Sequence, residues 1–135
     1  MELRSLKTSL SRLLELGKIS RWPKGRPIST SQMGLEIEMG DVPDAIIIGK
    51  AFDYKIRVRN PSATLMGIRL IANLITEEDV SEIASEHHDI VPRSDREITF
   101  RLVPMTDFKG KASIKVEIFY GSRSVSSEVY PTRLY

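Results

Sequence analysis

Residues 52–60 read FDYKIRVRN, and this stretch decides the fold class. Apolar side chains occupy every second position: Phe52, Tyr54, Ile56 and Val58. Charged side chains occupy the positions between them: Asp53, Lys55, Arg57 and Arg59. Successive side chains of an extended strand point to opposite faces, so this alternation predicts a strand with one buried and one charged face.

The same alternation recurs along the rest of the chain. We expect further strands at residues 34–39, 46–48, 66–75, 83–91, 98–102, 112–118 and 125–130. Turn-forming residues separate these segments at spacings of roughly ten residues, which is typical of an antiparallel β-sandwich. Alternation throughout argues against a parallel sheet buried on both faces. In residues 66–75, Ile71 and Ile75 fall on the face opposite to the other apolar side chains.

Residues 76–89 fit two interpretations. The sequence TEED at 76–79 fits a helix start, as a capping box with Asp in its last position. It also fits a polar turn that leads into a strand near 83–91, and we favour this second interpretation. The last strand, 125–130, is expected to end before Pro131.

Composition excludes several classes of protein. The 135 residues are 41% hydrophobic and 28% charged, as in an ordinary soluble domain. The chain has no cysteine, which excludes a disulfide framework, a thiolate zinc site, an iron–sulfur cluster and a cysteine nucleophile. A lack of cysteine together with many charges is also archaeal-like, in the manner of proteins from hot environments.

The formal net charge of +2 conceals an uneven distribution. Residues 1–27 contain seven Lys or Arg and two Glu, a net charge of 7 − 2 = +5. The remaining residues contain 13 basic and 16 acidic side chains, a net charge of −3. We therefore expect a basic N-terminal arm on a slightly acidic body, a distribution typical of an arm that contacts an anionic surface.

Leucines recur in the arm at steps of three and four, which places them on one face of a predicted amphipathic helix over residues 1–19. These leucines are Leu3, Leu6, Leu10, Leu13 and Leu14. A helix this short is marginal alone in water, so its leucine face needs a cover. The candidate covers are the body of the same protein, a second copy, a groove on a partner, or a bilayer surface.

Residues 20–33 have the composition of a linker, with the sequence SRWPKGRPISTSQ at 20–32. Trp22 lies among cations, where an aromatic ring stacks on a base, is buried at an interface, or pins the linker onto its own domain. We place Trp22 with the five leucines among the residues expected to bind a partner. The sandwich is expected to occupy residues 34–135.

Polar residues interrupt the leucines of the arm, so the arm lacks the continuous apolar core of a secretory signal. No stretch of the sequence approaches the roughly 18 apolar residues that span a membrane. We therefore expect a cytoplasmic location, and we do not expect a membrane surface as the partner.

Residues 49–118 combine several structural signals: Gly49, the strand 52–58 with V-x-N ending at Asn60, a second alternating strand at 68–72, the VPRS turn at 91–94, and G-x-x-x-I-x-V at 110–116. This arrangement resembles the immunoglobulin-like modules of the cell-adhesion-related type found in bacteria and archaea. The resemblance implies a binding or spacer module without catalytic residues. Members are mostly exported, so it implies the cell surface as the alternative location.

We therefore predict an all-β, immunoglobulin-like antiparallel β-sandwich of seven or eight strands, preceded by an N-terminal amphipathic helix. Residues for catalysis are scarce in it. His87 and His88 are neighbours that would point to opposite faces of a strand, which disfavours one shared metal site. Nucleophile-elbow and phosphate-binding glycine motifs are absent from the sequence. We expect no enzymatic activity, no metal, no cofactor and no small-molecule substrate.

Two functions remain. We favour a non-enzymatic interaction or assembly module that docks on a protein partner or self-associates, through the arm, an open sheet edge, or both. The alternative is a nucleic-acid-associated structural protein, coat-like or ribonucleoprotein-like, because clustered cations bind phosphates. Its candidate contacts are Lys18, Arg21, Lys24 and Arg26 in the arm and Lys55, Arg57 and Arg59 on the strand.

Overall fold

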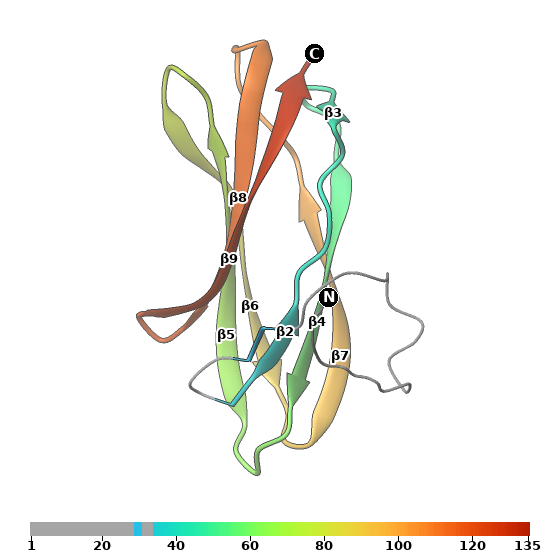
Figure 1. Ribbon diagram of the computed structural model, residues 1–135, viewed down its shortest axis with the longest axis vertical. Coiled ribbons are helices and arrows are strands. Elements are labelled where there is room, and N and C mark those ends of the chain that lie inside the picture. Colours follow the sequence, from blue (N-terminus) through green and yellow to red (C-terminus); the bar gives the residue numbers. More distant parts are fainter. Residues whose placement is uncertain (1–28, 31–33) are drawn as a thin grey trace, which may run out of the picture.

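The computed structural model describes residues 29–30 and 34–135, and this part of the chain is all-β (Figure 1). Two sheets face each other as the layers of a sandwich, with orders β1-β2-β4-β7 and β3-β9-β8-β5-β6. The predicted helix over 1–19 and most of the linker 20–33 lie outside the described residues. The prediction of an all-β sandwich is confirmed.

The first sheet contains β1 (Ser29–Thr30), β2 (Glu36–Glu38), β4 (Phe52–Asn60) and β7 (Ser94–Leu102). The second sheet contains β3 (Ala45–Ile46), β5 (Met66–Ile75), β6 (Val80–Ile90), β8 (Gly110–Tyr120) and β9 (Arg123–Leu134). Within the described residues, β1 and β3 have only two residues each, and seven strands are longer. The predicted seven or eight strands agree with this count of longer segments.

The core lies between the sheets and is built from the apolar positions of the alternating strands. Tyr54 and Phe100 are its largest fully buried side chains. Full burial of a large apolar side chain contributes about 1.5–3 kcal/mol, so the alternating apolar positions hold the two layers together. The remaining fully buried large side chains are Leu35, Ile37, Ile56, Ile68, Leu70, Leu74, Ile90, Leu102, Ile114 and Ile118.

The chain crosses from the first sheet to the second between β2 and β3. A Cβ atom on Gly40 would lie 2.2 Å from the carbonyl oxygen of Lys55, so only glycine fits this close approach to β4. The Tyr130 hydroxyl of β9 donates to the Gly40 carbonyl at 2.7 Å and also bonds the Tyr54 hydroxyl of β4. These contacts fix the crossing to both sheets.

Residues 76–90 form the turn and strand that we favoured. The Thr76 hydroxyl accepts the backbone N–H groups of Glu78 (3.1 Å) and Asp79 (3.2 Å), and the Thr76 N–H donates to the Asp79 carbonyl. These bonds close a tight polar turn, after which β6 begins at Val80 and pairs with β5. The Thr76 hydroxyl, which the helical interpretation placed in a capping box, therefore stabilises a turn instead.

The prediction that the last strand ends before Pro131 is wrong, because β9 continues to Leu134. The N–H of Arg133 donates to the Asp44 carbonyl at 3.0 Å, on the side of β9 that faces away from β8. Pro131 lies two residues earlier and faces the same way. There, β9 has no strand beside it among the described residues, since β3 pairs only with Arg133 and Leu134. The missing N–H therefore leaves the β8–β9 ladder intact.

Two further expectations need correction. The predicted strand 46–48 is shorter and shifted, because β3 ends at Ile46 and the chain then turns. The pairing of β3 with β9 is parallel, whereas every other pair in the two sheets is antiparallel within the described residues. β3 joins the edge of the second sheet directly after the chain crosses from the first sheet, and it runs alongside the end of β9.

Candidate interaction surfaces

The predicted basic row on β4 does not form an open stripe of cations. The Arg57 side chain is 9% exposed. Its guanidinium donates two hydrogen bonds to Asp95 of β7, from Nε to Oδ1 at 2.8 Å and from Nη2 to Oδ2 at 2.5 Å. Arg59 lies 3.4 Å from a carboxylate oxygen of Glu36, while Lys55 is exposed. Two of the three cations on this strand that we predicted to contact nucleic acid are thus paired with carboxylates.

Cross-strand register explains this pairing. Arg59 lies opposite Glu36 on one side and Asp95 on the other, and Arg57 lies opposite Glu38 and Glu97. Alternation along one strand shows that these cations share a face. It does not show which acids the neighbouring strands bring beside them, so sequence reasoning missed the match.

The arm residues that we expect to bind a partner or nucleic acid all lie in residues 1–28, outside the described part of the chain. They are Leu3, Leu6, Leu10, Leu13, Leu14, Lys18, Arg21, Trp22, Lys24 and Arg26. Their assignments therefore stay predictions.

Apolar side chains from three strands lie on the outside of the five-stranded sheet, with the polar side chains of Asn73, Lys115 and Glu117 among them. Val80, Ile75, Ser113 and Pro131 stand in one line across β6, β5, β8 and β9. Val129 and Ile71 occupy the same face one and two rows away. Val80 is 65% exposed and Val129 is 53% exposed. We call this surface the outer apolar face, defined by Ile71, Ile75, Val80, Val129 and Pro131.

The sequence contains part of the signal for this face, because Ile71 and Ile75 already fall opposite the other apolar positions of their strand. Val80 and Pro131 join them only through strand register. An acidic stretch borders the face at the β5–β6 turn, where residues 76–86 contain five acidic side chains and no Lys or Arg. Four of these carboxylates are exposed: Glu77, Glu78, Asp79 and Glu82.

The β6 edge of the second sheet carries polar side chains that point into the sandwich. Glu86 and His88 lie opposite the buried Leu70 and Ile68, so they share the inward face. His88 Nε2 lies 2.8 Å from Glu86 Oε1, and its Nδ1 lies 3.2 Å from Nη2 of Arg96 on β7. Because arginine only donates, Nδ1 accepts this bond and Nε2 carries the proton.

The contact between His88 and Arg96 joins the two sheets at the edge formed by β6 and β7. The predicted opposite orientation of the histidines is confirmed, since His87 points outward and is 64% exposed by its side chain. Inward-pointing charged groups and the bulge at Ile83 both oppose the addition of a further strand to β6. On β9, Glu128 lies opposite the buried Val116 of β8 and therefore also points inward. Its charge likewise opposes the addition of a strand. The edge of β6 and the unpaired part of β9 are therefore poor docking sites for a further strand.

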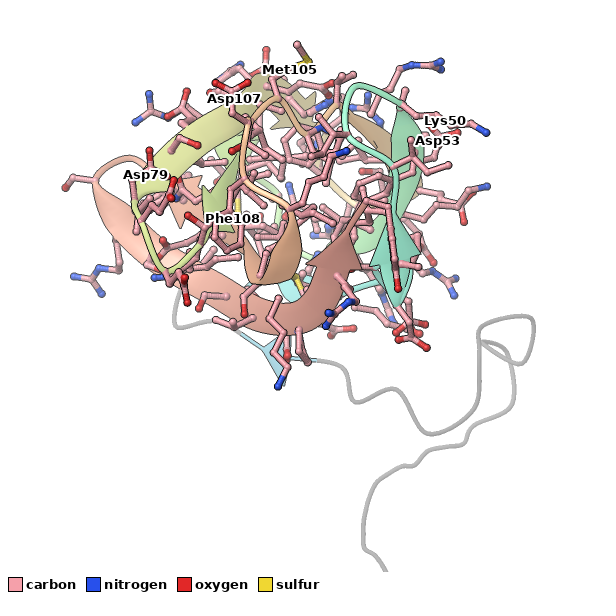
Figure 2. The ribbon with its side chains drawn as sticks, turned by 90° about the horizontal axis from the view of Figure 1, so that it is seen from above. Lys50, Asp53, Asp79, Met105, Asp107 and Phe108 are labelled. Atoms are coloured by element: carbon pink, nitrogen blue, oxygen red, sulfur yellow. The ribbon has the colours of Figure 1, made fainter. Side chains whose placement is uncertain are left out.

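Figure 2 shows the end of the sandwich where the C-terminus lies. Phe108, from the loop between β7 and β8, lies over the space between the two sheets and packs against the core. Its N–H donates to the Thr106 hydroxyl at 3.1 Å, which shapes the loop. Asp107 and the exposed Met105 belong to the same loop, and Asp79 lies on the neighbouring β5–β6 turn at this end of the sandwich. This end is a capped core with a polar rim.

In residues 29–30 and 34–135, acidic and histidine side chains nowhere gather in a group of three or more suited to a metal ion. A helix of the length and apolarity needed to cross a bilayer does not occur in those ranges. The geometry of the described surfaces is thus one of packing and ion pairing.

Comparison with known proteins bears on the fold. No known protein family matches the sequence, and no curated protein matches it significantly. A mutant β-glucosidase from Listeria innocua in complex with laminaribiose is 12% identical with a TM-score of 0.58, over 75% of this chain and 16% of the enzyme. The same enzyme in complex with isofagomine is 13% identical with a TM-score of 0.56, over 74% of this chain and 16% of the enzyme.

The CARDB domain of a Pyrococcus furiosus protein, in complex with di-metal ions, is 13% identical with a TM-score of 0.50. That alignment covers 90% of this chain and 100% of the CARDB domain. This chain thus spans only 16% of the β-glucosidase but the whole length of the CARDB domain. At these identities the likeness concerns the fold alone, and the fold of this chain resembles the cell-adhesion-related, immunoglobulin-like CARDB sandwich.

Proposed function

We propose that this chain is a non-enzymatic interaction module that self-associates or docks on a protein partner through the leucine face of residues 3–14. The observation that carries the proposal is the sequence pattern of the arm, in which five leucines recur at steps of three and four among basic residues. Among the described residues, the two sheets bury their own apolar side chains against each other. A leucine stripe of this kind fits contact with another surface.

The likeness to the CARDB domain supports a module without chemistry of its own, since it extends over the whole of that domain. The likeness to the β-glucosidase gives no support to glycosidase activity, because it concerns 16% of the enzyme at 12% identity. The pairing of Arg57 with Asp95 and of Arg59 with Glu36 weakens the strand part of the nucleic-acid alternative, which then depends on the cations of the arm.

Affinity purification from the native organism tests the proposal. The full chain and a variant with Leu6, Leu10 and Leu13 replaced by Ser serve as bait. A matched control replaces Ser5, Ser9 and Ser11 of the same arm by Ala. We expect the wild type and the control to retain the same partner or a second copy, and the leucine variant to lose it. Equal retention by all three baits would overturn the proposal.

Fluorescence titration with DNA and RNA at two salt concentrations tests the alternative. Phosphate contacts release counterions, so binding through the arm cations would weaken steeply as the salt concentration rises. We expect weak binding that changes little with salt. Tight, salt-dependent binding that is lost on replacing Arg21, Lys24 and Arg26 by Gln would favour the nucleic-acid function instead.

A further inference from the structure

The outer apolar face brings together Val80 and Val129, which are 65% and 53% exposed, with Ile71, Ile75 and Pro131. We propose that this face receives the leucine stripe of residues 3–14 from a second copy of the chain. The inference rests on the proposed function and names the surface at which self-association takes place. Its support comes from the dimensions of the face, its bordering charge, and the sheet from which the arm departs.

The dimensions of the two surfaces match. The line Val80, Ile75, Ser113 and Pro131 crosses four strands, and three spacings of about 4.8 Å make it roughly 14 Å long. The leucine stripe from Leu3 to Leu14 rises about 16 Å in an α-helix. Ser113, in the middle of the line, is small enough to admit a leucine between its larger neighbours.

The charges of the two surfaces are complementary. The exposed carboxylates of the β5–β6 turn lie beside Val80 at one end of the face. The arm carries cations next to its leucines: Arg4, Lys7, Arg12 and Lys18. On the same face, Lys115 is already held by Glu117 at 3.6 Å. Lys111 and Arg133 lie on the same face in the row next to Ser113 and Pro131, so the acidic β5–β6 turn is the part of the border that attracts the basic side of the arm.

The position of β1 favours a second copy over the same chain. The arm joins the body at β1, which belongs to the four-stranded sheet, while the outer apolar face covers the far side of the five-stranded sheet. To reach its own face, the linker would have to turn around the β9 edge. A neighbouring copy presents its face directly, and a two-fold axis lets each copy give and receive one arm.

The absence of cysteine from the chain allows a direct test by thiol labelling. Val80→Cys places one thiol at the proposed contact, and Leu65→Cys places one at a position that is 51% exposed and outside the face. Each is made in the full chain with and without Leu6, Leu10 and Leu13 replaced by Ser. We expect the intact arm to slow labelling at position 80 at least about tenfold, or about 1.4 kcal/mol, and to leave position 65 unchanged.

The molar mass of the same samples separates the outcomes. Protection at position 80 that disappears on dilution to the monomer supports the second copy. Protection that persists in the monomer overturns the inference, because the chain then covers its own face. If the leucine variant has the lower molar mass but labelling at position 80 is unchanged, self-association through the leucines stands and the outer apolar face is not the surface that receives them. Where neither mass nor labelling changes, this inference and self-association through the leucines both fail.

Discussion

Replacement of Asn60 by Asp is the sharpest test of how the sandwich is held at the end opposite the C-terminus. Asn60 is fully buried at the end of β4. Its Nδ2 donates to the carbonyls of Thr64 (2.8 Å) and Ile90 (3.0 Å), and its Oδ1 accepts the N–H (3.1 Å) and hydroxyl (2.6 Å) of Ser62. One side chain thus ties the loop after β4 to the end of β6, across the two sheets.

The structure sets the order of two substitutions at this site. Asn60→Ala removes the bonds to Thr64, Ile90 and Ser62 and a longer one from Nδ2 to the Val91 carbonyl (3.3 Å). Each bond has a net value of about 1 kcal/mol and water replaces part of them, so we expect a loss of roughly 3 kcal/mol. Asn60→Asp keeps the shape and the two bonds from Ser62. It turns a carboxylate oxygen toward the carbonyls of Thr64 and Ile90, and burial of an unpaired charge raises the expected loss at pH 7 to about 4 kcal/mol or more.

The Asn60→Asp variant also gains a pH dependence of known sign. Burial beside two carbonyl oxygens raises the pKa of the introduced carboxyl in the folded state. The folded state then binds more protons than the unfolded state, so the free energy of unfolding increases as the pH falls through that raised pKa. The protonated carboxyl also donates one of the lost bonds.

Urea unfolding followed by far-ultraviolet circular dichroism at pH 7 and pH 5 measures both effects. Ser62→Ala is the control, with one lost hydroxyl and an expected loss of about 1 kcal/mol at either pH. The reasoning fails if Asn60→Asp is as stable as the wild type at pH 7. It also fails if acid does not narrow the gap between the Asp variant and the wild type.

Three further predictions use the same unfolding assay. Gly40→Ala should cost about 3 kcal/mol or more, because its Cβ would lie 2.2 Å from the Lys55 carbonyl oxygen; a cost near zero would refute the close approach of the crossing segment. Arg57→Ala should cost about 1–2 kcal/mol and Lys55→Ala less than about 0.5 kcal/mol, and equal effects would contradict the buried pairing. His88→Ala should destabilise the chain more than His87→Ala and speed amide exchange in β6, since only His88 joins the sheets.

Strand positions followed from local sequence because alternation is a local property. The 52–60 stretch predicts β4 almost residue for residue, and residues 76–90 form the favoured turn and strand. Pro131 misled the prediction because its effect depends on which side of β9 lacks a neighbour, and only the sheet order shows that. The parallel pairing of β3 has the same origin, since it depends on where the chain crosses between sheets.

The surfaces were harder to predict than the strands. Arg57 and Arg59 read as a basic stripe along one strand, but register places Asp95 and Glu36 beside them. The sequence predicts that His87 and His88 point to opposite faces, but not that His88 is the one that faces inward and contacts Arg96 from the other sheet. The outer apolar face joins residues from three strands, β5, β6 and β9. In each case the information lies in cross-strand neighbours, which a single sequence read along its length does not contain.

Sedimentation equilibrium of the full chain over a range of concentrations tests whether the leucine face is the interaction surface. We expect a reversible rise from one chain mass of 15.3 kDa toward twice that mass, or a stable complex with the partner when it is present. The variant with Leu6, Leu10 and Leu13 replaced by Ser should stay at one chain mass and bind no partner. An identical mass distribution for both proteins, alone and with the partner, would contradict the assignment of the leucine face as the interaction surface.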